Sequence, residues 1–157
     1  MLNKTQQLLS YIIQHHAKAS VTVLMKISYL IDLVSLKKEN QQITHYAYMR
    51  YTYGPFDNQI YSDIEALAQA NIISPKPDYV PSGEEYITYS INEGAIFDFS
   101  ELTPQDRAIA DEVLESVKGY GARTLTEIAY KTKPMTELGA TLGGSEHIGE
   151  TLNLDAA

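Results

Sequence analysis

The segment at residues 21–38, VTVLMKISYLIDLVSLKK, constrains the fold more than any other part of the chain. Ser20 is suited to cap the amino end of a helix here, and Lys37 and Lys38 stand near its carboxyl end, where the helix dipole favours cations. The apolar side chains recur at helical spacing, at Val23, Leu24, Ile27, Leu30, Ile31 and Val34. The sequence therefore predicts a long helix at the centre of the core.

Four further helices are predicted from apolar spacing and capping residues. They cover residues 4–17, residues 57–70 with Asp57 as N-cap, residues 103–119 and residues 123–132. In the third of these, Thr103 is the N-cap, Pro104 takes the first helical position and Asp106 completes an acidic variant of the capping box. A chain of 157 residues is long enough for one domain with a substantial core.

Two segments are predicted to form strands. YAYMRYTY, at residues 46–53, alternates along the chain and is expected to end at Gly54-Pro55. Residues 71–92 fit two short strands joined by a turn near Pro81-Ser82-Gly83. A helix followed by such a hairpin is the order found in a winged helix. The predicted fold class is mainly α (α+β), a compact helical domain with a short β-hairpin in a winged-helix-like arrangement.

The carboxyl-terminal part of the sequence changes in composition at residue 134. Residues 134–157 are rich in Gly, Thr and acidic side chains, and we expect them to form a flexible acidic tail on a folded domain at residues 1–133. The last six residues, LNLDAA, resemble a bacterial degradation tag. Two interpretations stay open, namely a degradation signal and an unselected disordered end.

Composition limits the chemistry and the location of the protein. The chain has no cysteine, which excludes disulfides, zinc–thiolate sites and cysteine nucleophiles. It has no run of about 18 apolar residues, as a membrane-spanning helix requires. The first residues, MLNKTQQLLSYIIQHHAK, interleave polar with apolar side chains and predict an amphipathic helix instead of a signal peptide. We therefore expect a cytoplasmic protein that does not contact membranes.

The net charge of −8 is distributed unevenly. Residues 1–60 contain six Lys/Arg and three Asp/Glu, which gives +3, whereas residues 61–157 contain six Lys/Arg and seventeen Asp/Glu, which gives −11. The acidic second part disfavours non-specific binding to nucleic acid. It suits a basic protein partner, or it is simply a solvated surface.

No catalytic, metal-binding or cofactor-binding pattern is present in the sequence. The four histidines, His15, His16, His45 and His147, do not have the spacing of a metal-binding motif. Phosphate-binding loops, dinucleotide fingerprints and nucleophile elbows are also missing. The sequence thus predicts a protein that is not an enzyme and holds no cofactor.

The densest group of aromatic residues is YMRYTYGPFDNQIYSDI, at residues 48–64. On an alternating strand, Tyr51 and Tyr53 share a face with Met49, while Tyr48 and Arg50 point the other way. One face should therefore lie in the core and the other in solvent. Because tyrosine offers a large rigid surface and a hydroxyl at low entropic cost, this segment suits recognition as well as packing.

LMKISYLIDL (24–33) followed by YTYGPFDNQIY (51–61) resembles the Panacea domain, the SocA-like antitoxin domain of bacteria and phages. This family has a Lys-Leu-x-Lys-Leu-x-Tyr helix, then an aromatic-x-Tyr-Gly-Pro turn, then a helix carrying a tyrosine. Tyr51 replaces the usual Trp, Val23 replaces the first lysine, Ser28 replaces an apolar residue, and Tyr130 replaces a histidine further along. The resemblance covers roughly residues 5–130, and its motif positions are Leu24, Lys26, Tyr29, Tyr51, Tyr53, Gly54, Pro55 and Tyr61.

The resemblance implies an antitoxin that neutralises a co-encoded toxin by direct binding. Toxins across the family are chemically varied, and at least one relative acts as an adaptor that delivers its toxin to a protease. A toxin encoded nearby, and a cellular protease as a second partner, are therefore the implied partners. The eight motif residues become candidates for partner binding.

Two alternatives come from the residues themselves. A winged-helix DNA-binding regulator fits the order of elements and the basic residues 1–60. Its predicted recognition helix, however, carries Asp57, Asp63 and Glu65 and neither Lys nor Arg, which disfavours contact with phosphates. An enzyme would use Lys26 and the tyrosines as an acid/base pair, whereas the alternative role of Lys26 is structural.

Overall fold

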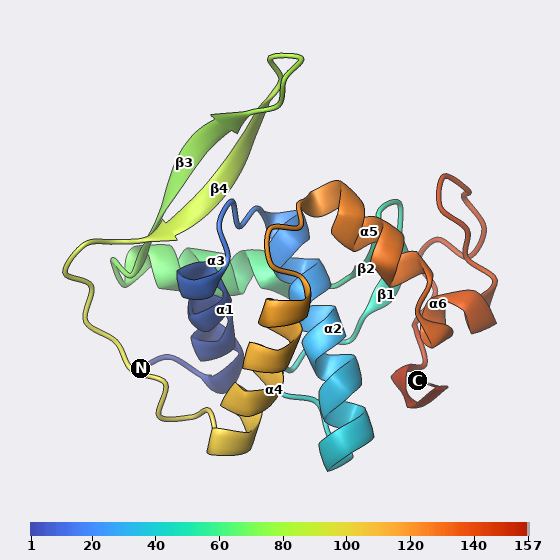
Figure 1. Cartoon of the computed structure of the whole chain (residues 1–157), viewed down its shortest axis with the longest axis horizontal. Coiled ribbons are helices and arrows are strands. Elements are labelled where there is room, and N and C mark those ends of the chain that lie inside the picture. The colour runs from blue at the N-terminus through green and yellow to red at the C-terminus, as the bar shows by residue number, and fades with distance from the viewer. Residues whose placement is uncertain (157) are drawn as a thin grey trace.

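The computed structural model describes residues 1–156, which form a mainly helical α+β domain (Figure 1). The helices are α1 (Lys4–His15), α2 (Val21–Glu39), α3 (Gln59–Gln69), α4 (Pro104–Ser116), α5 (Ala122–Tyr130) and α6 (Lys133–Leu138), with a 3₁₀ turn η1 (Leu154–Ala156). The strands are β1 (Met49–Tyr51), β2 (Gly54–Phe56), β3 (Ile73–Tyr79) and β4 (Glu85–Ile91). The predicted fold class, helices with a short hairpin, is confirmed.

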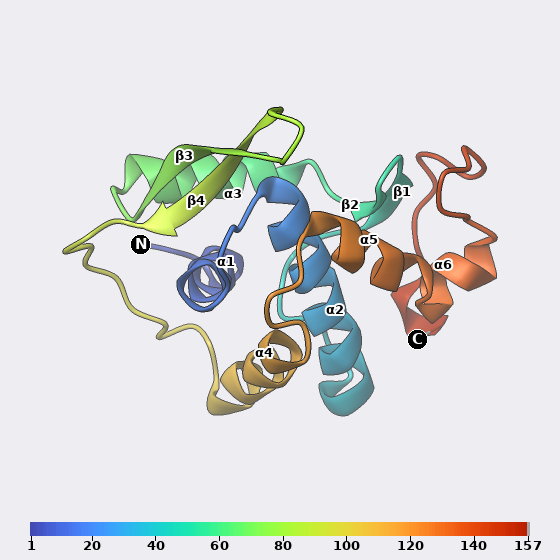
Figure 2. The same ribbon diagram turned by 45° about the horizontal axis from the view of Figure 1, so that its top comes forward.

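Helix α2 lies at the centre of the domain, as predicted. Helices α1 and α4 pack on one side of it, and α5 and β2 pack on the other (Figures 1 and 2). The side chain of Ser20 caps its amino end by accepting a hydrogen bond from the Val23 amide at 3.2 Å. At the other end Asn40 adopts a left-handed conformation with φ 59° and ends the helix. Ten of the nineteen residues of α2 are buried, which explains its long apolar stretch.

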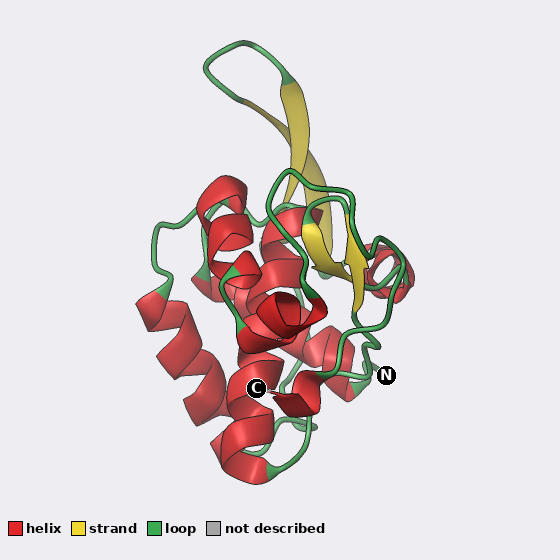
Figure 3. Ribbon diagram, turned by 90° about the vertical axis from the view of Figure 1, so that its right-hand side faces the viewer, coloured by secondary structure: helices red, strands yellow, loops and turns green. Residues whose placement is uncertain are grey.

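The β3–β4 hairpin projects from the helical body (Figures 1 and 3). Its strands pair antiparallel, with Ser74 opposite Ser90 and Lys76 opposite Thr88. The Asn92 amide donates to the Ile72 carbonyl, and hydrogen-bonded positions alternate along an antiparallel strand, so the backbones of Ser74 and Lys76 bond to β4. The backbones of Pro75 and Pro77, between them, face the free edge of β3. Proline has no amide hydrogen, and these two residues therefore weaken the outer edge of β3 as a template for another strand. The hairpin follows α3 as in a winged helix, and that assignment remains a prediction.

The segment around Gly54 differs from the strand that was predicted. The chain does not stop pairing at Gly54-Pro55, because Thr52-Tyr53 form a tight turn and β2 folds back on β1 with Arg50 opposite Pro55. Gly54 has φ +103°, a conformation that side chains rarely adopt, and this allows the reversal. Buried Tyr48 and Arg50 alternate with half-buried Tyr51 and exposed Tyr53, so the predicted division into two faces is correct.

Helix α3 begins at Gln59, one residue later than an N-cap at Asp57 predicts. The N-cap is Asn58, which makes no capping hydrogen bond through its side chain. Asp57 instead accepts hydrogen bonds from the amides of Gln59, at 2.9 Å, and Ala47, at 2.8 Å. It thereby fastens the start of α3 to the segment that leads into β1. The predicted capping box of Thr103 and Asp106 at the start of α4 is confirmed.

Part of the segment predicted as a tail packs against the domain. It contains α6, and Met135, Leu152 and Leu154 are buried. The Arg50 amide donates to the Glu150 carbonyl at 2.8 Å, and the Leu152 amide donates to the Tyr48 carbonyl at 2.9 Å, so this segment runs beside β1 (Figure 3). A domain boundary after residue 133 and flexibility of the segment remain predictions. The last residue of LNLDAA lies outside the described residues.

Candidate functional site

The Tyr-Gly-Pro turn is built over the buried side chain of Lys26. Lys26 is 1% exposed and its Nζ donates a hydrogen bond to the Pro55 carbonyl at 3.0 Å. A Cβ on residue 54 would stand 3.4 Å from Lys26 Cε and 3.5 Å from Tyr130 Cε2, which is van der Waals contact, so the turn lies directly on these two side chains. Burial lowers the pKa of Lys26 to about 8. Helix α2 thus holds the turn from beneath through a cation.

A second buried cation, Arg50, supports the other side of the turn. Its guanidinium donates to the carbonyls of Tyr51, Thr141, at 3.2 Å, and Gly144, at 2.8 Å. The guanidinium carbon lies 5.2 Å from the centre of the Tyr130 ring, and the Tyr130 hydroxyl donates to the Thr52 carbonyl at 3.1 Å. Arg50 and Tyr130 therefore join β1 and α5 to the loop at residues 141–144.

Three aromatic rings cover the outer side of the turn. Tyr51 meets Phe56 edge to face with ring centres 5.8 Å apart, and Phe56 meets Tyr61 at 5.9 Å. Tyr53 is 69% exposed and Tyr61 is 56% exposed. We call the surface formed by Tyr51, Thr52, Tyr53, Phe56 and Tyr61 the turn face. Exposed aromatic rings held on short rigid elements are typical of protein-binding surfaces.

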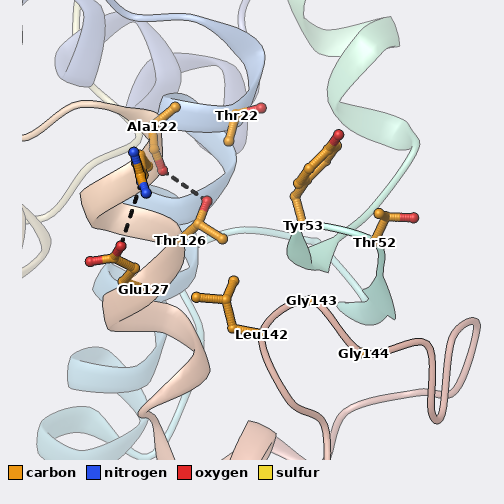
Figure 4. A pocket seen from close by; sticks show the side chains of 10 residues that line it. Thr22, Thr52, Tyr53, Ala122, Thr126, Glu127, Leu142, Gly143 and Gly144 are labelled. Atoms are coloured by element: carbon orange, nitrogen blue, oxygen red, sulfur yellow. Dashed lines mark hydrogen bonds and ion pairs between the residues drawn. The ribbon is translucent and has the colours of Figure 1, made fainter.

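Tyr53 stands between two hollows. The first, the α5 hollow, has a volume of about 550 Å³ and lies between α5 and the loop at residues 141–144, with Tyr53 and Leu142 in its wall (Figure 4). The second, the Lys26 hollow, has a volume of about 370 Å³. Its lining residues are Val21, Thr22, Lys26, Tyr51, Thr52, Tyr53, Gly54, Phe56, Asn58 and Tyr61. The two hollows share Thr22, Thr52 and Tyr53, so they form one continuous uneven surface around the turn.

The eight residues taken from the sequence motif separate into two groups. Lys26, Tyr51, Tyr53, Gly54 and Tyr61 all line the Lys26 hollow, and Pro55 receives the Lys26 hydrogen bond. Leu24 and Tyr29, in contrast, are fully buried. The Tyr29 hydroxyl lies 2.7 Å from Thr132 Oγ1, and burial raises its pKa to about 12. These two residues hold the core, and their role in partner binding remains a prediction.

Sequence reasoning missed Arg50 and the loop at residues 141–144. A lone arginine on a strand usually faces solvent, and nothing in the sequence indicates that the loop carbonyls would surround it. Tyr130 stood out only as a departure from the family pattern. The available signal was the alternation along the strand, which places Tyr48 and Arg50 on the same face. If that face lies in the core, Arg50 points inward.

A different cluster of hydroxyls surrounds Asp32 in the core. Asp32 accepts hydrogen bonds from the Ile43 amide at 2.9 Å, the Thr44 amide at 3.1 Å, Thr44 Oγ1 at 2.6 Å and the Tyr48 hydroxyl at 2.7 Å. We call these four residues the Asp32 network. Burial raises the pKa of Asp32, while these donors act in the opposite direction. The network ties the loop that precedes β1 to α2.

These features define a helical domain in which a buried lysine supports an exposed Tyr-Gly-Pro turn. The model of one family, described as antitoxin SocA-like, Panacea domain, matches residues 24–134, which is well over half of the chain. The chain therefore belongs to this family. No curated protein and no solved structure was found to match it. Among the helices of residues 1–156, none is long and apolar enough to cross a membrane.

Proposed function

We propose that this protein is the antitoxin of a toxin–antitoxin pair and that it neutralises a co-encoded toxin by binding it directly through the turn face. Membership of the antitoxin family supports the class of function. The observation that carries the proposal is the position of Tyr53 and Tyr61, which are exposed on a turn held from beneath by two buried cations. The proposed mode of action is binding in the cytoplasm, without catalysis.

The rigidity of the turn face favours specific recognition. Tyr51 and Tyr61 both contact Phe56, and the backbone beneath them is fixed by Lys26. A surface that is already ordered loses little conformational entropy when it binds. Tyrosine is enriched among the residues that dominate binding energy at protein interfaces.

The DNA-binding alternative gains less support from the structure. Helix α3 contains no Lys or Arg within Gln59–Gln69, and the projecting hairpin adds Lys76 together with Asp78, Glu84 and Glu85. Contact with phosphates depends on basic side chains, and few of them lie on this surface.

Delivery of the toxin to a protease is a further form of the proposed function, and it requires the same toxin-binding surface.

The test is co-expression of the adjacent open reading frame in an inducible host, with and without this protein, followed by capture of the complex. We expect the neighbouring product to stop growth alone, and this protein to restore growth and to co-purify with it. Replacement of both Tyr53 and Tyr61 by serine should abolish rescue and capture. A neighbouring product that is harmless alone would refute the antitoxin function for this protein.

A matched variant separates loss of binding from loss of folding. Tyr79 and Tyr86 lie on the β3–β4 hairpin and not on the turn face, and Tyr79 is also exposed. Replacement of both by serine also removes two tyrosine side chains, but from a surface outside the turn face. Retained rescue by this variant, together with equal Tm values for both double variants, would assign binding to the turn face. Equal loss of rescue in the two variants would contradict that assignment.

A further inference from the structure

The Lys26 hollow combines one positive charge with several hydroxyl groups. Of the side chains that line it within the described chain, Lys26 is basic and none is acidic. Tyr53 and Tyr61 bring phenol groups that can donate hydrogen bonds, and Val21 and Phe56 bring apolar surface. This set of groups is suited to an anion that also has an apolar part.

The cations beneath the turn are not neutralised by the protein itself. Within residues 1–156, the ion pairs formed by carboxylates involve Lys4, Lys38, His45, Arg123, Lys133 and His147, and neither Lys26 nor Arg50. Lys26 and Arg50 bond to backbone carbonyls instead. The chain has a net charge of −8, yet its turn face lies over two positive charges. Charge complementarity therefore favours a negative group on whatever binds there.

We infer that the Lys26 hollow receives the carboxylate of one aspartate or glutamate side chain of the protein partner. This inference rests on the proposed function. The carboxylate would accept hydrogen bonds from Tyr53 and Tyr61 and face the Lys26 ammonium, which is shielded from water. Charges attract more strongly in such surroundings than in water, so one acidic side chain would contribute much of the specificity.

A carboxylate fits this hollow better than a phosphate group. Phosphate sites usually combine arginine forks or several basic side chains. The lining here provides a single lysine beside the first residues of α2, Val21 and Thr22, and the N-cap of α3, Asn58, and these helix ends favour either anion. Arg50 is not among the lining residues, and its two terminal nitrogens donate to the carbonyls of residues 51, 141 and 144, while its buried Nε has no hydrogen-bond partner within residues 1–156. One positive charge matches one carboxylate.

The first experiment measures the affinity of the purified complex with the co-encoded toxin. Lys26→Met removes the charge and keeps the length of the side chain, and Lys118→Met makes the same change in net charge at an exposed residue outside the hollow. We expect Lys26→Met to weaken binding about tenfold or more and Lys118→Met to change it less than about twofold. Tyr61→Phe, which removes one hydroxyl, provides a second variant in case Lys26→Met has a lowered Tm.

A double-mutant cycle identifies the partner's carboxylate. Each exposed Asp and Glu of the toxin is changed to its amide, and one of these changes should weaken binding to the wild-type antitoxin without weakening binding to Lys26→Met any further. Binding of Lys26→Met and Tyr61→Phe with unchanged affinity would overturn the inference while leaving the antitoxin function intact.

A test without the toxin distinguishes failure of the inference from failure of the proposed function. Sodium acetate, sodium phosphate and sodium chloride are added at equal ionic strength while the NMR signals of Lys26, Tyr53 and Tyr61 are followed. A saturable shift with acetate that is absent in Lys26→Met supports the carboxylate site even if no toxin is found. A stronger response to phosphate, or the same response to all three salts, would overturn it.

Discussion

The Asp32 network and the turn face use tyrosine in opposite ways. In the network, Tyr48 is buried and donates its hydroxyl to a fixed carboxylate. At the turn face, Tyr53 and Tyr61 are exposed above a buried lysine. The buried charge of Asp32 accepts five hydrogen bonds from the same chain, four from the network and one from Gln42, while the turn face places a buried charge beside an open hollow. A buried charge that is hydrogen-bonded by donors of the same chain indicates a structural role. A buried charge without an oppositely charged partner, beneath exposed aromatic rings, indicates a role in binding.

The comparison predicts the largest loss of stability in the network. Asp32→Ala leaves two backbone amides and two hydroxyls without their acceptor, and it should lower the free energy of unfolding by roughly 3 kcal/mol or more. Urea unfolding followed by circular dichroism measures this. Tyr48→Phe removes only one donor and should cost about 1 kcal/mol. Near-equal stability of Asp32→Ala and wild type would show that the network does not hold the fold.

Gly54→Ala should have the next largest effect, because it strains the backbone of the turn itself. At φ +103° an alanine costs about 1–3 kcal/mol, and its Cβ would also come into contact with Lys26 and Tyr130. We expect a lower Tm and reduced toxin binding together. Gly83→Ala, at φ +91° with no atom within 4 Å of the added carbon, serves as the matched control for backbone strain alone. If both variants bind the toxin equally well, the shape of the turn does not matter for recognition.

The lysine beneath the turn predicts a pH dependence of smaller size. Burial lowers the pKa of Lys26 in the folded state from 10.5 to about 8, so the unfolded chain binds more protons between these values. The stability of the wild type should therefore rise relative to that of Lys26→Met by about 2 kcal/mol between about pH 7 and 9.5. Parallel denaturant titrations of both proteins provide the measurement. A constant difference across this range would mean that Lys26 titrates normally.

The exposed tyrosines should have the smallest effect on stability. Tyr53→Ser and Tyr61→Ser, made singly, should change the free energy of unfolding by less than about 0.5 kcal/mol, because both side chains lie largely in solvent. Their effect should appear in the dissociation rate of the toxin complex, measured by surface plasmon resonance. Destabilisation comparable to that of Tyr48→Phe would erase the distinction between the two groups of tyrosines.

Several parts of this protein were determined by the sequence at short range. The long helix at residues 21–38, the hairpin at residues 71–92 and the capping box at Thr103 follow from local spacing and capping chemistry, and the structure has all of them. The ordered motif from Leu24 to Tyr61 also indicated the family, which the family model confirms. Alternation along residues 48–53 correctly separated an inner from an outer face, since adjacent strand residues point in opposite directions.

Tertiary structure alone decided how the turn is supported. Arg50 is buried because carbonyls at residues 141 and 144, far along the chain, surround its guanidinium, and Lys26 lies under Gly54 because α2 packs against β2. The flexible tail was predicted because residues 134–157 are rich in Gly, Thr and acidic side chains, and that composition gave no sign that Leu152 and Leu154 would be buried or that Leu152 would bond to Tyr48 beside β1. The local sequence determines how each residue interacts with its near neighbours in the chain. Which distant groups bury a charge, and which leave it facing a hollow, is fixed only when the helices pack.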